Sequence, residues 1–197
     1  MTDYDLVIRG GRVVVGGDLC QCDIGVSGGR ITAISERLGS GREEVDATDR
    51  LVLPGGVDGH CHLDQPTADG SRMADGFESG TRSAACGGTT TVIPFALQRQ
   101  GETLRDAVNE YHRRAMNNAY VDYAFHMIVT DPTQQVVGQE LPALIAEGYT
   151  SFKIYMTYPD LKLEDREILD ILAVARAHGG MVMIHAENDD CVTWLTE

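Results

Sequence analysis

The chain has 197 residues, of which 43% are hydrophobic and 23% charged, as is ordinary for a globular protein. Its net charge of −14 and its scattered basic residues make nucleic acid and anionic membranes unexpected partners. No apolar run approaches membrane-spanning length, and the acidic start leads into a strand-like segment instead of a signal peptide. The 5 cysteines follow no disulfide or zinc-ribbon spacing, so we expect a reduced, cytoplasmic compartment.

The first part of the chain, residues 1–50, has the pattern of β structure. Glycine pairs at positions 10–11 and 28–29 each separate two short runs rich in β-branched residues. Two-glycine turns between such runs are typical of β-hairpins, and neither pair matches a phosphate-binding loop. We therefore expect a small antiparallel sheet whose hairpins turn at these glycines.

From residue 51 the pattern changes to short apolar strands that alternate with amphipathic helices. This alternation is typical of βα units around a parallel sheet, either doubly wound or part of a (β/α)8 barrel. No Gly-x-Gly-x-x-Gly follows the first strand, so a dinucleotide-binding version has no support. The pattern predicts strands over 51–57, 89–95, 120–129, 150–156 and 181–185, and helices near 77–86, 103–117, 139–147 and 166–178.

Two histidines follow the first of these strands. Side chains of an extended strand alternate between its faces, so His60 and His62 are expected on one face and Cys61 on the other. Two imidazoles on one face could close on one metal ion, although a lone His-x-His also occurs as two surface histidines near a turn. Asp58 and Asp64 share the parity of the histidines and are candidates for carboxylates that support such a site.

Later strands place further polar residues at comparable positions. Lys153 lies within the fourth strand and His185 ends the fifth, and in a barrel the carboxyl ends of the strands converge on one mouth. A buried lysine has a lowered pKa, and its neutral amine can add carbon dioxide to give a carbamate that bridges two cations. His60 and His62 would then hold one metal and His185 the other, an arrangement suited to hydrolysis of an amide-like bond.

Each of these residues also has a plainer interpretation. Lys153 could extend to solvent or pair with an acidic residue, and His185 could be a satisfied histidine at a strand end. Tyr158 could stabilise an oxyanion or simply pack. His126 lies mid-strand and could face the barrel interior.

Four stretches together resemble a known family. The chain resembles the cyclic amidohydrolases, specifically the dihydropyrimidinase and hydantoinase group of the amidohydrolase superfamily. The first stretch reads Leu-Pro-Gly-Gly-Val-Asp-Gly-His-Cys-His-Leu-Asp and the last reads Ile-His-Ala-Glu-Asn. The stretches that carry the resemblance are residues 53–64, 77–91, 151–158 and 184–188.

The resemblance implies a (β/α)8 metallo-hydrolase barrel over residues 51–197, truncated after about the fifth strand, beside an incomplete β-sandwich over residues 1–50. It implies hydrolytic opening of a cyclic amide or imide ring with two divalent ions, usually zinc, in a homo-oligomer that is commonly a tetramer. It assigns His60 and His62 to one metal, His185 to the second, and N6-carboxylated Lys153 to the bridge. Tyr158 would contact the substrate and stabilise the tetrahedral intermediate.

The sequence departs from the family pattern in two ways. A further histidine and an aspartate that acts as ligand and general base are not present, so we expect a fragment that is inactive alone. A half-barrel would also expose the apolar edges of its first and fifth strands. In addition, Pro94 precedes Phe95 where many relatives carry an acidic residue, which concerns the substrate subgroup rather than the reaction.

Three alternatives remain at this point. Allantoinase and dihydroorotase are alternative activities within the same reaction class. A non-catalytic scaffold, like the collapsin-response mediator proteins, is an alternative of another class, although it would have no physical need for four convergent ligands. The chain could also fold by itself as a metal-binding module.

Overall fold

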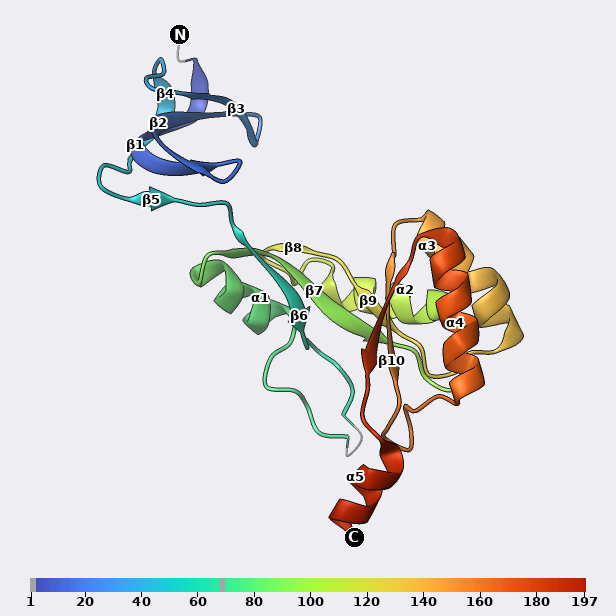
Figure 1. Ribbon diagram of the computed structural model, residues 1–197. Coiled ribbons are helices and arrows are strands. Elements are labelled where there is room, and N and C mark those ends of the chain that lie inside the picture. The colour runs from blue at the N-terminus through green and yellow to red at the C-terminus, as the bar shows by residue number, and fades with distance from the viewer. Residues whose placement is uncertain (1–2, 68–69) are drawn as a thin grey trace. The chain divides into compact units, whose positions relative to one another are not determined.

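The computed structural model describes residues 3–67 and 70–197 (Figure 1). Contacts divide the chain into two compact units, one that ends at Gly55 and one that begins at Gly56, and we describe each by itself. No helix of the described ranges is both long enough and apolar enough to cross a membrane.

The first unit is a five-stranded sheet with the order β3-β2-β1-β4, in which β5 also pairs with β1. Antiparallel pairing joins β1 to β2 and β2 to β3, whereas β4 and β5 run parallel to β1. The expectation of a purely antiparallel sheet is therefore wrong, because the chain crosses over before β4. The strands are β1 (Tyr4–Val15), β2 (Asp18–Ser27), β3 (Arg30–Ser35), β4 (Gly41–Asp46) and β5 (Leu51–Val52).

The first hairpin does not turn at the first glycine pair. Strand β1 continues through Gly10 and Gly11 with a shift of register, and the chain turns at Gly16 and Gly17, both with positive φ. A side chain at Gly11 would meet the side chain of Val52 at 2.6 Å, so this glycine permits close packing instead of a turn. The second hairpin turns at residues 28–29 as expected.

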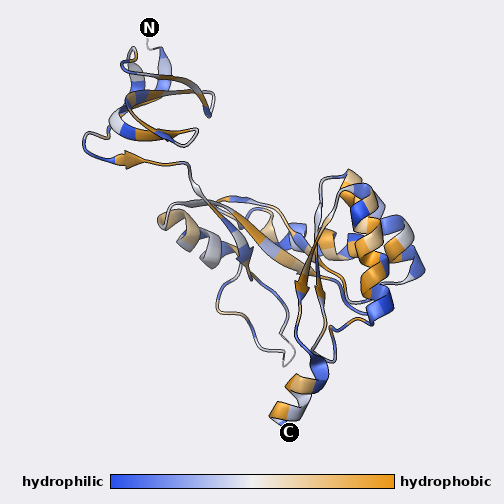
Figure 2. Ribbon diagram, in the orientation of Figure 1, coloured by the Kyte–Doolittle hydropathy of each residue, from blue (hydrophilic) through white to orange (hydrophobic). Residues whose placement is uncertain are grey.

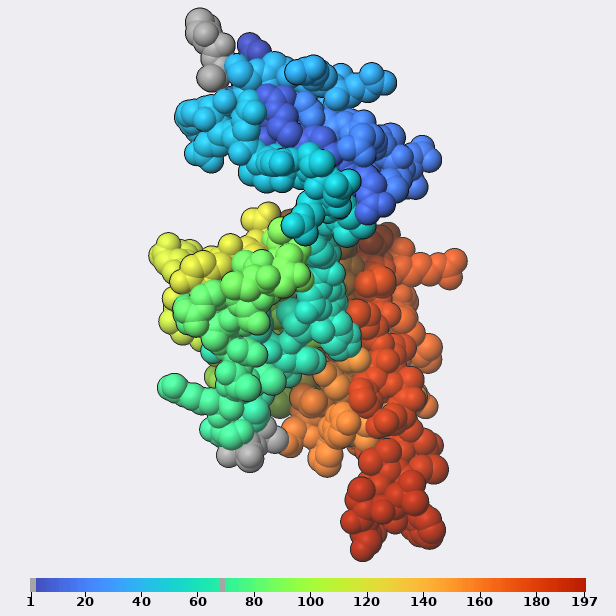
Figure 3. Space-filling view, turned by 90° about the vertical axis from the view of Figure 1, so that its left-hand side faces the viewer, coloured from blue at the N-terminus to red at the C-terminus, as the bar shows by residue number. Residues whose placement is uncertain are grey.

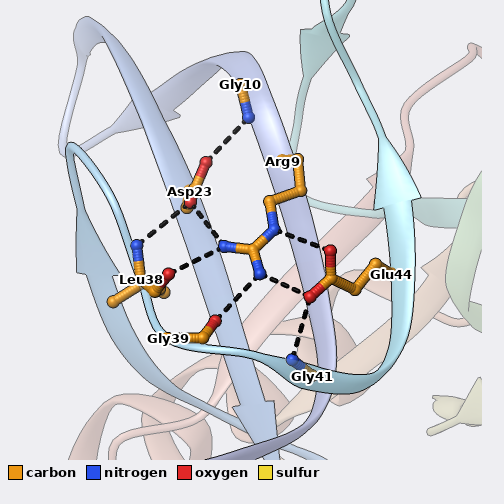
Figure 4. A network of polar contacts seen from close by, with 7 residues as sticks. All are labelled: Arg9, Gly10, Asp23, Leu38, Gly39, Gly41 and Glu44. Carbon is orange, nitrogen blue, oxygen red and sulfur yellow. Dashed lines mark hydrogen bonds and ion pairs between the residues drawn. The ribbon is translucent and has the colours of Figure 1, made fainter.

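A polar network ties this sheet together (Figure 4). The Arg9 guanidinium donates to Asp23 at 2.9 Å and to Glu44 at 3.0 Å, and it also donates to two backbone carbonyls. Asp23 is 5% exposed and accepts the N–H groups of Gly10 and Leu38 as well. Every charged partner in the network therefore has several hydrogen bonds, which suits a unit whose apolar core is small.

The second unit is a parallel sheet of six strands with the order β11-β10-β9-β7-β6, in which β8 also pairs with β7. All of its pairings are parallel, as predicted from the alternation of strands and helices. The strands are β6 (Gly56–Cys61), β7 (Thr89–Leu97), β8 (Asp122–Tyr123), β9 (His126–Ile128), β10 (Ser151–Tyr155) and β11 (Met181–His185).

All four predicted helices are present. The helix over 77–86 is confirmed, and the other predicted helices differ at their ends by up to three residues. A last helix, α5, was not predicted. The helices are α1 (Phe77–Cys86), α2 (Leu104–Ala115), the π-helical turn η1 (Val136–Glu140), α3 (Leu141–Ala146), α4 (Asp165–His178) and α5 (Asp189–Thr196).

Two predicted strands are each divided in the structure. The strand over 51–57 becomes β5 and β6, which belong to different sheets, because Pro54 lacks an N–H group and two glycines follow it. The strand over 120–129 becomes β8 and β9, which pair with β7 in the same register on either side of a two-residue break.

The main core lies between one face of this sheet and the helices. Phe152 and Ile154 of β10 are fully buried in it together with Met127 of β9, and apolar residues run along β7 and β10 (Figure 2). The residues between them point to the opposite face, where Phe95, Ile128 and Tyr155 form a smaller cluster. This second face carries the candidate site.

The edges of the sheet are exposed, as we expected for a half-barrel. Val57 on β6 is 64% exposed and Met181 on β11 is 55% exposed. Helix α5 extends beyond the end of β11 (Figures 1 and 3), and none of its residues is buried.

Candidate active site

Strand β10 presents Lys153 and Tyr155 to the face opposite the helices, because Phe152 and Ile154 occupy the helix side. The parallel register with β11 sets Met183 beside Lys153 and His185 beside Tyr155. Alternation along one strand and register with its neighbour therefore bring Lys153 and His185 to the same face, as the sequence predicts.

His60 near the end of β6 and His62 just after it reach this face as well. The rings of His60 and His62 lie 5.7 Å apart, and both contact Phe95 of β7, at 4.8 and 5.1 Å between ring centroids. Cys61 packs against the helix-side core, so the predicted separation of Cys61 from the two histidines is confirmed. Phe95 supports both imidazoles and is itself 1% exposed.

A hydrogen bond orients the His62 ring. Its Nδ1 lies 2.5 Å from the side-chain oxygen of Gln65, which requires the proton on Nδ1. Nε2 is then left as a lone-pair donor, the form in which a histidine binds a metal. Sequence reasoning missed Gln65, although its position three residues after His62 was the available signal.

Lys153 is buried without a charged partner. The residue is 8% exposed, and burial lowers the pKa of its amine. Its Nζ lies 5.1 Å from the centre of the Tyr155 ring, and it forms no hydrogen bond or ion pair with any residue of the described ranges. The expected alternative, a lysine that pairs with an acidic side chain, is therefore not what the structure shows.

The surroundings of His60 lower the pKa of its imidazole. Partial burial, followed by the charges of His62, Lys153 and His126, lowers the pKa of His60. The imidazole is thus favoured in its neutral form, in which it can donate a lone pair.

His185 lies between two tyrosines. Its ring stacks on Tyr155 at 5.5 Å and lies 5.1 Å from the ring of Tyr158. Its buried Nε2 makes no hydrogen bond within the described part of the chain, although a carboxylate oxygen of Glu187 lies 3.0 Å away in a poor orientation. A buried nitrogen without a hydrogen bond is costly in a protein, and a metal ion would satisfy it.

Tyr158 has an unusual backbone conformation. Its φ is +71°, in the left-handed region that disfavours tyrosine, and its side chain is partly exposed. It lines a hollow of about 550 Å³ with residues of the loops that follow β6, β7 and β9, among them Pro66, Gln98 and Thr130. His60, His62, Lys153 and His185 do not line this hollow.

His126 has a structural position. One ring nitrogen lies 2.9 Å from the carbonyl oxygen of Gly59 and the other pairs with the hydroxyl of Ser151. The ring faces the site side of the sheet, as considered from the sequence, but both of its nitrogens are already in use. It ties β6 and β10 to β9 directly beneath the candidate ligands.

The two aspartates chosen by parity have other roles in the structure. Asp58 pairs with Val92 on the helix side, because β6 is irregular between Asp58 and Cys61, and its carboxylate accepts the N–H of His60. The Asp64 carboxylate accepts the N–H of Phe77 at 2.8 Å, at the start of α1. The rule that alternate residues share one face fails for both aspartates, because it holds only along a regular strand.

The described residues fit a metal centre only if one ligand is of an unusual kind. No group of three or more His, Cys, Asp and Glu side chains within residues 3–67 and 70–197 is arranged to hold a metal ion. Two histidines, a buried unpaired lysine and a third histidine with an unused nitrogen are present instead. A carbamate on Lys153 would add the missing carboxylate to this set.

Comparison with known proteins identifies the family of the chain. A family model described as the amidohydrolase family matches residues 51–197. The chain belongs to the amidohydrolase family. A parallel sheet with helices on one face fits part of the barrel of this family.

Curated relatives and solved structures agree on the group. The chain is 41% identical to a D-hydantoinase of Streptomyces coelicolor, over 97% of this chain and 42% of that protein. It is 42% identical to a D-hydantoinase of Geobacillus stearothermophilus, over 97% of this chain and 41% of that protein. A solved D-hydantoinase structure superposes with a TM-score of 0.93 at 38% identity, over 98% of this chain and 42% of that one.

A dihydropyrimidinase from Brevibacillus agri also superposes closely. Its TM-score is 0.90 at 38% identity, with 96% of this chain and 41% of that chain covered. The chain therefore spans about two fifths of the length of the relatives that it matches. This extent fits the expected fragment of the barrel.

Proposed function

We propose that this chain belongs to a longer protein that opens a cyclic amide or imide ring by hydrolysis. The substrates would be a dihydropyrimidine or a 5-substituted hydantoin, and the product the corresponding N-carbamoyl amino acid. The observation that carries this proposal is the buried, unpaired Lys153 on the same face as His60, His62 and His185. The names of the relatives, D-hydantoinase and dihydropyrimidinase, support the substrate class.

In this proposal the four residues hold two divalent ions, most simply zinc. His60 and His62 would hold one, His185 would hold the second, and a carbamate on Lys153 would supply a carboxylate to both. The ions would supply Lewis acidity, which polarises a carbonyl and acidifies water. Residues 1–50 would contribute to a β-sandwich and residues 51–197 would supply the first five βα units of a (β/α)8 barrel, in a cytoplasmic homo-oligomer.

The chain's own residues prepare this chemistry. Burial lowers the pKa of the Lys153 amine, which favours the neutral form whose nitrogen can form a bond to the carbon of carbon dioxide and release one proton. Gln65 holds the proton of His62 on Nδ1, which directs Nε2 toward a metal. Phe95 packs against both histidine rings and keeps water from their apolar side.

Tyr158 would act on the substrate. Its hydroxyl is positioned on a turn beside His185, and a hydroxyl donor there could stabilise the oxyanion that forms when water adds to the ring carbonyl. The hollow next to Tyr158 is lined by two leucines and two prolines together with polar residues such as Gln98 and Arg99, so it offers both apolar contacts and hydrogen-bond partners to a cyclic amide.

The full-length protein tests the proposal directly. We expect hydrolysis of dihydrouracil or a 5-substituted hydantoin and about two metal equivalents per protomer, with allantoin and dihydroorotate as competing substrates in the same panel. Lys153→Ala should abolish activity, and a short carboxylic acid with added metal should restore part of it. A fully active Lys153→Ala protein would refute the carbamate bridge, and a metal-free, inactive wild type would favour a scaffold.

A further inference from the structure

The turn that carries Tyr158 is held at both of its ends. After β10 the chain turns at Tyr158, whose carbonyl accepts the N–H groups of Leu161 and Lys162 at 2.8 and 2.9 Å. Lys162 then lies beside Tyr155 again, and the N–H of Leu163 donates to the carbonyl of Tyr155. The chain thus leaves β10 and returns to it within a few residues.

The carboxylate of Asp189 connects the two ends of this turn. One of its oxygens accepts the hydroxyl of Thr157 at 2.9 Å and the other accepts the ammonium of Lys162 at 2.6 Å. Thr157 directly precedes Tyr158 and is 1% exposed, whereas Lys162 closes the turn. The hydrogen bonds from Lys162 and Thr157 lower the pKa of Asp189, so the carboxylate is charged near neutral pH.

Asp189 belongs to a different loop from Tyr158. It is the first residue of α5 and follows His185 at the end of β11 by four positions. His185, the last residue of β11, contacts the ring of Tyr158, and Asp189, four residues later, binds the side chains of Thr157 and Lys162 before and after that tyrosine. A tyrosine at positive φ needs such support, because the isolated backbone disfavours that conformation.

We propose that Asp189 is a positioning residue for Tyr158, and that it acts by bracing Thr157 and Lys162 on either side of it. This inference rests on the proposed function, in which Tyr158 stabilises an oxyanion. A hydrogen-bond donor contributes to catalysis only while it is held where the charge develops. Asp189 does not touch the substrate and is not a catalytic residue.

The neighbouring Asp190 provides a matched control. It carries the same charge in the first turn of α5, is exposed, and forms no side-chain hydrogen bond or ion pair within the described ranges. In the full-length protein we expect Asp189→Ala to lower kcat about 10- to 100-fold with KM nearly unchanged, as for a misplaced group. Asp189→Asn keeps an acceptor for Thr157 and should lose less, whereas Asp190→Ala should leave kcat and KM nearly unchanged.

A second measurement does not depend on activity. Hydrogen exchange of the Leu161 and Lys162 amides reports whether the turn is closed, because both donate to Tyr158. We expect both amides to exchange faster in Asp189→Ala and in Lys162→Met, and at an unchanged rate in Asp190→Ala. In the double variant Asp189→Ala/Lys162→Met they should exchange no faster than in Asp189→Ala alone. If Asp189→Ala fails to fold, Asp189→Asn and Lys162→Met carry the same comparison.

The possible results separate the two proposals. Equal kcat and equal exchange in Asp189→Ala and Asp190→Ala would overturn the role of Asp189. An equal loss in both would overturn it too, because the charge at the start of α5 would then be the cause. If the wild type opens no cyclic amide, the proposed function fails, and the exchange comparison still decides whether Asp189 holds the turn.

Discussion

Buried ionisable groups of the two units differ in how well they are paired, as Asp23 in the first unit and Lys153 in the second show. In the first unit the buried Asp23 accepts hydrogen bonds from Arg9 and from two backbone N–H groups (Figure 4). In the second unit Lys153 is buried with no ion pair in the described part of the chain, and His185 has a buried nitrogen without a hydrogen bond. A satisfied buried charge serves the fold, whereas an unsatisfied one costs stability and is retained for another purpose. The contrast is the one that the proposed function requires of Asp23 and Lys153.

Lys153 should give the largest effect. We expect Lys153→Met in the full-length protein to lower kcat/KM at least about 1,000-fold, because the loss of a metal bridge removes several kcal/mol of transition-state stabilisation. The same variant should unfold at an equal or higher temperature in metal-free protein, since the apolar side chain avoids burying an unpaired amine. Activity assays and thermal unfolding of the metal-free protein measure the two effects.

The chain contains a second lysine that serves as a control for the carbamate. Lys162 pairs with Asp189, whose hydrogen bond raises the pKa of its amine, so it stays protonated and should not react with carbon dioxide. Protein equilibrated with ¹³C-labelled bicarbonate should show a carbamate carbon signal that disappears in Lys153→Met and persists in Lys162→Met. A carbamate signal that persists in Lys153→Met would contradict the assignment of the carbamate to Lys153.

Asp23 should give an effect on stability alone. Asp23→Ala would remove one acceptor of Arg9 and the acceptor of two partly buried N–H groups, and we expect a loss of about 1–3 kcal/mol in the free energy of unfolding. Denaturant unfolding measures this loss. Asp18→Ala, an exposed residue of the same strand, should cost little, and kcat/KM should change in neither variant.

His126 offers a comparison inside the second unit. His126→Phe keeps the ring packing against Phe95 but removes the hydrogen bonds to Gly59 and Ser151, so we expect a loss of about 1–2 kcal/mol in the free energy of unfolding. The metal content should stay the same. His60→Phe should instead change the free energy of unfolding little and lose bound metal. Metal analysis and denaturant unfolding of both variants check this contrast.

Sequence alone predicted the parts of the site that depend on regular geometry. Alternation along an extended strand was enough to separate His60 and His62 from Cys61, and a strand end in a parallel sheet was enough to bring Lys153 and His185 to one face. The placement of Lys153 and His185 held because β10 and β11 keep a regular register, and that of the two histidines and Cys61 held although the register of β6 shifts between Asp58 and Cys61.

The rest depends on contacts that no local pattern reveals. Asp64 caps α1 from 13 residues away, and Asp189 reaches Lys162 across 27 residues. Gln98, buried after β7, bonds backbone groups of Thr130 and Asp131 some 32 residues later. Such partners are selected by how loops meet in three dimensions, and the close packing of Gly11 in β1 against Val52 is equally absent from any local pattern.

The smallest expected effect is the pH dependence of the stability that Asp23 contributes to the first unit. Burial alone would raise the pKa of Asp23, but the N–H groups of Gly10 and Leu38 and the guanidinium of Arg9 outweigh it, so the pKa lies below its ordinary value. A carboxylate with a lowered pKa stabilises the fold above its unfolded pKa of about 4, and that contribution is lost as the pH falls through the folded pKa. The difference in unfolding free energy between wild type and Asp23→Asn should therefore be largest near pH 7 and shrink below about pH 4. Denaturant unfolding at several pH values measures it, with Asp18→Asn as the control. A difference that stays constant with pH would mean that the shape of Asp23, and not its charge, supports the sheet.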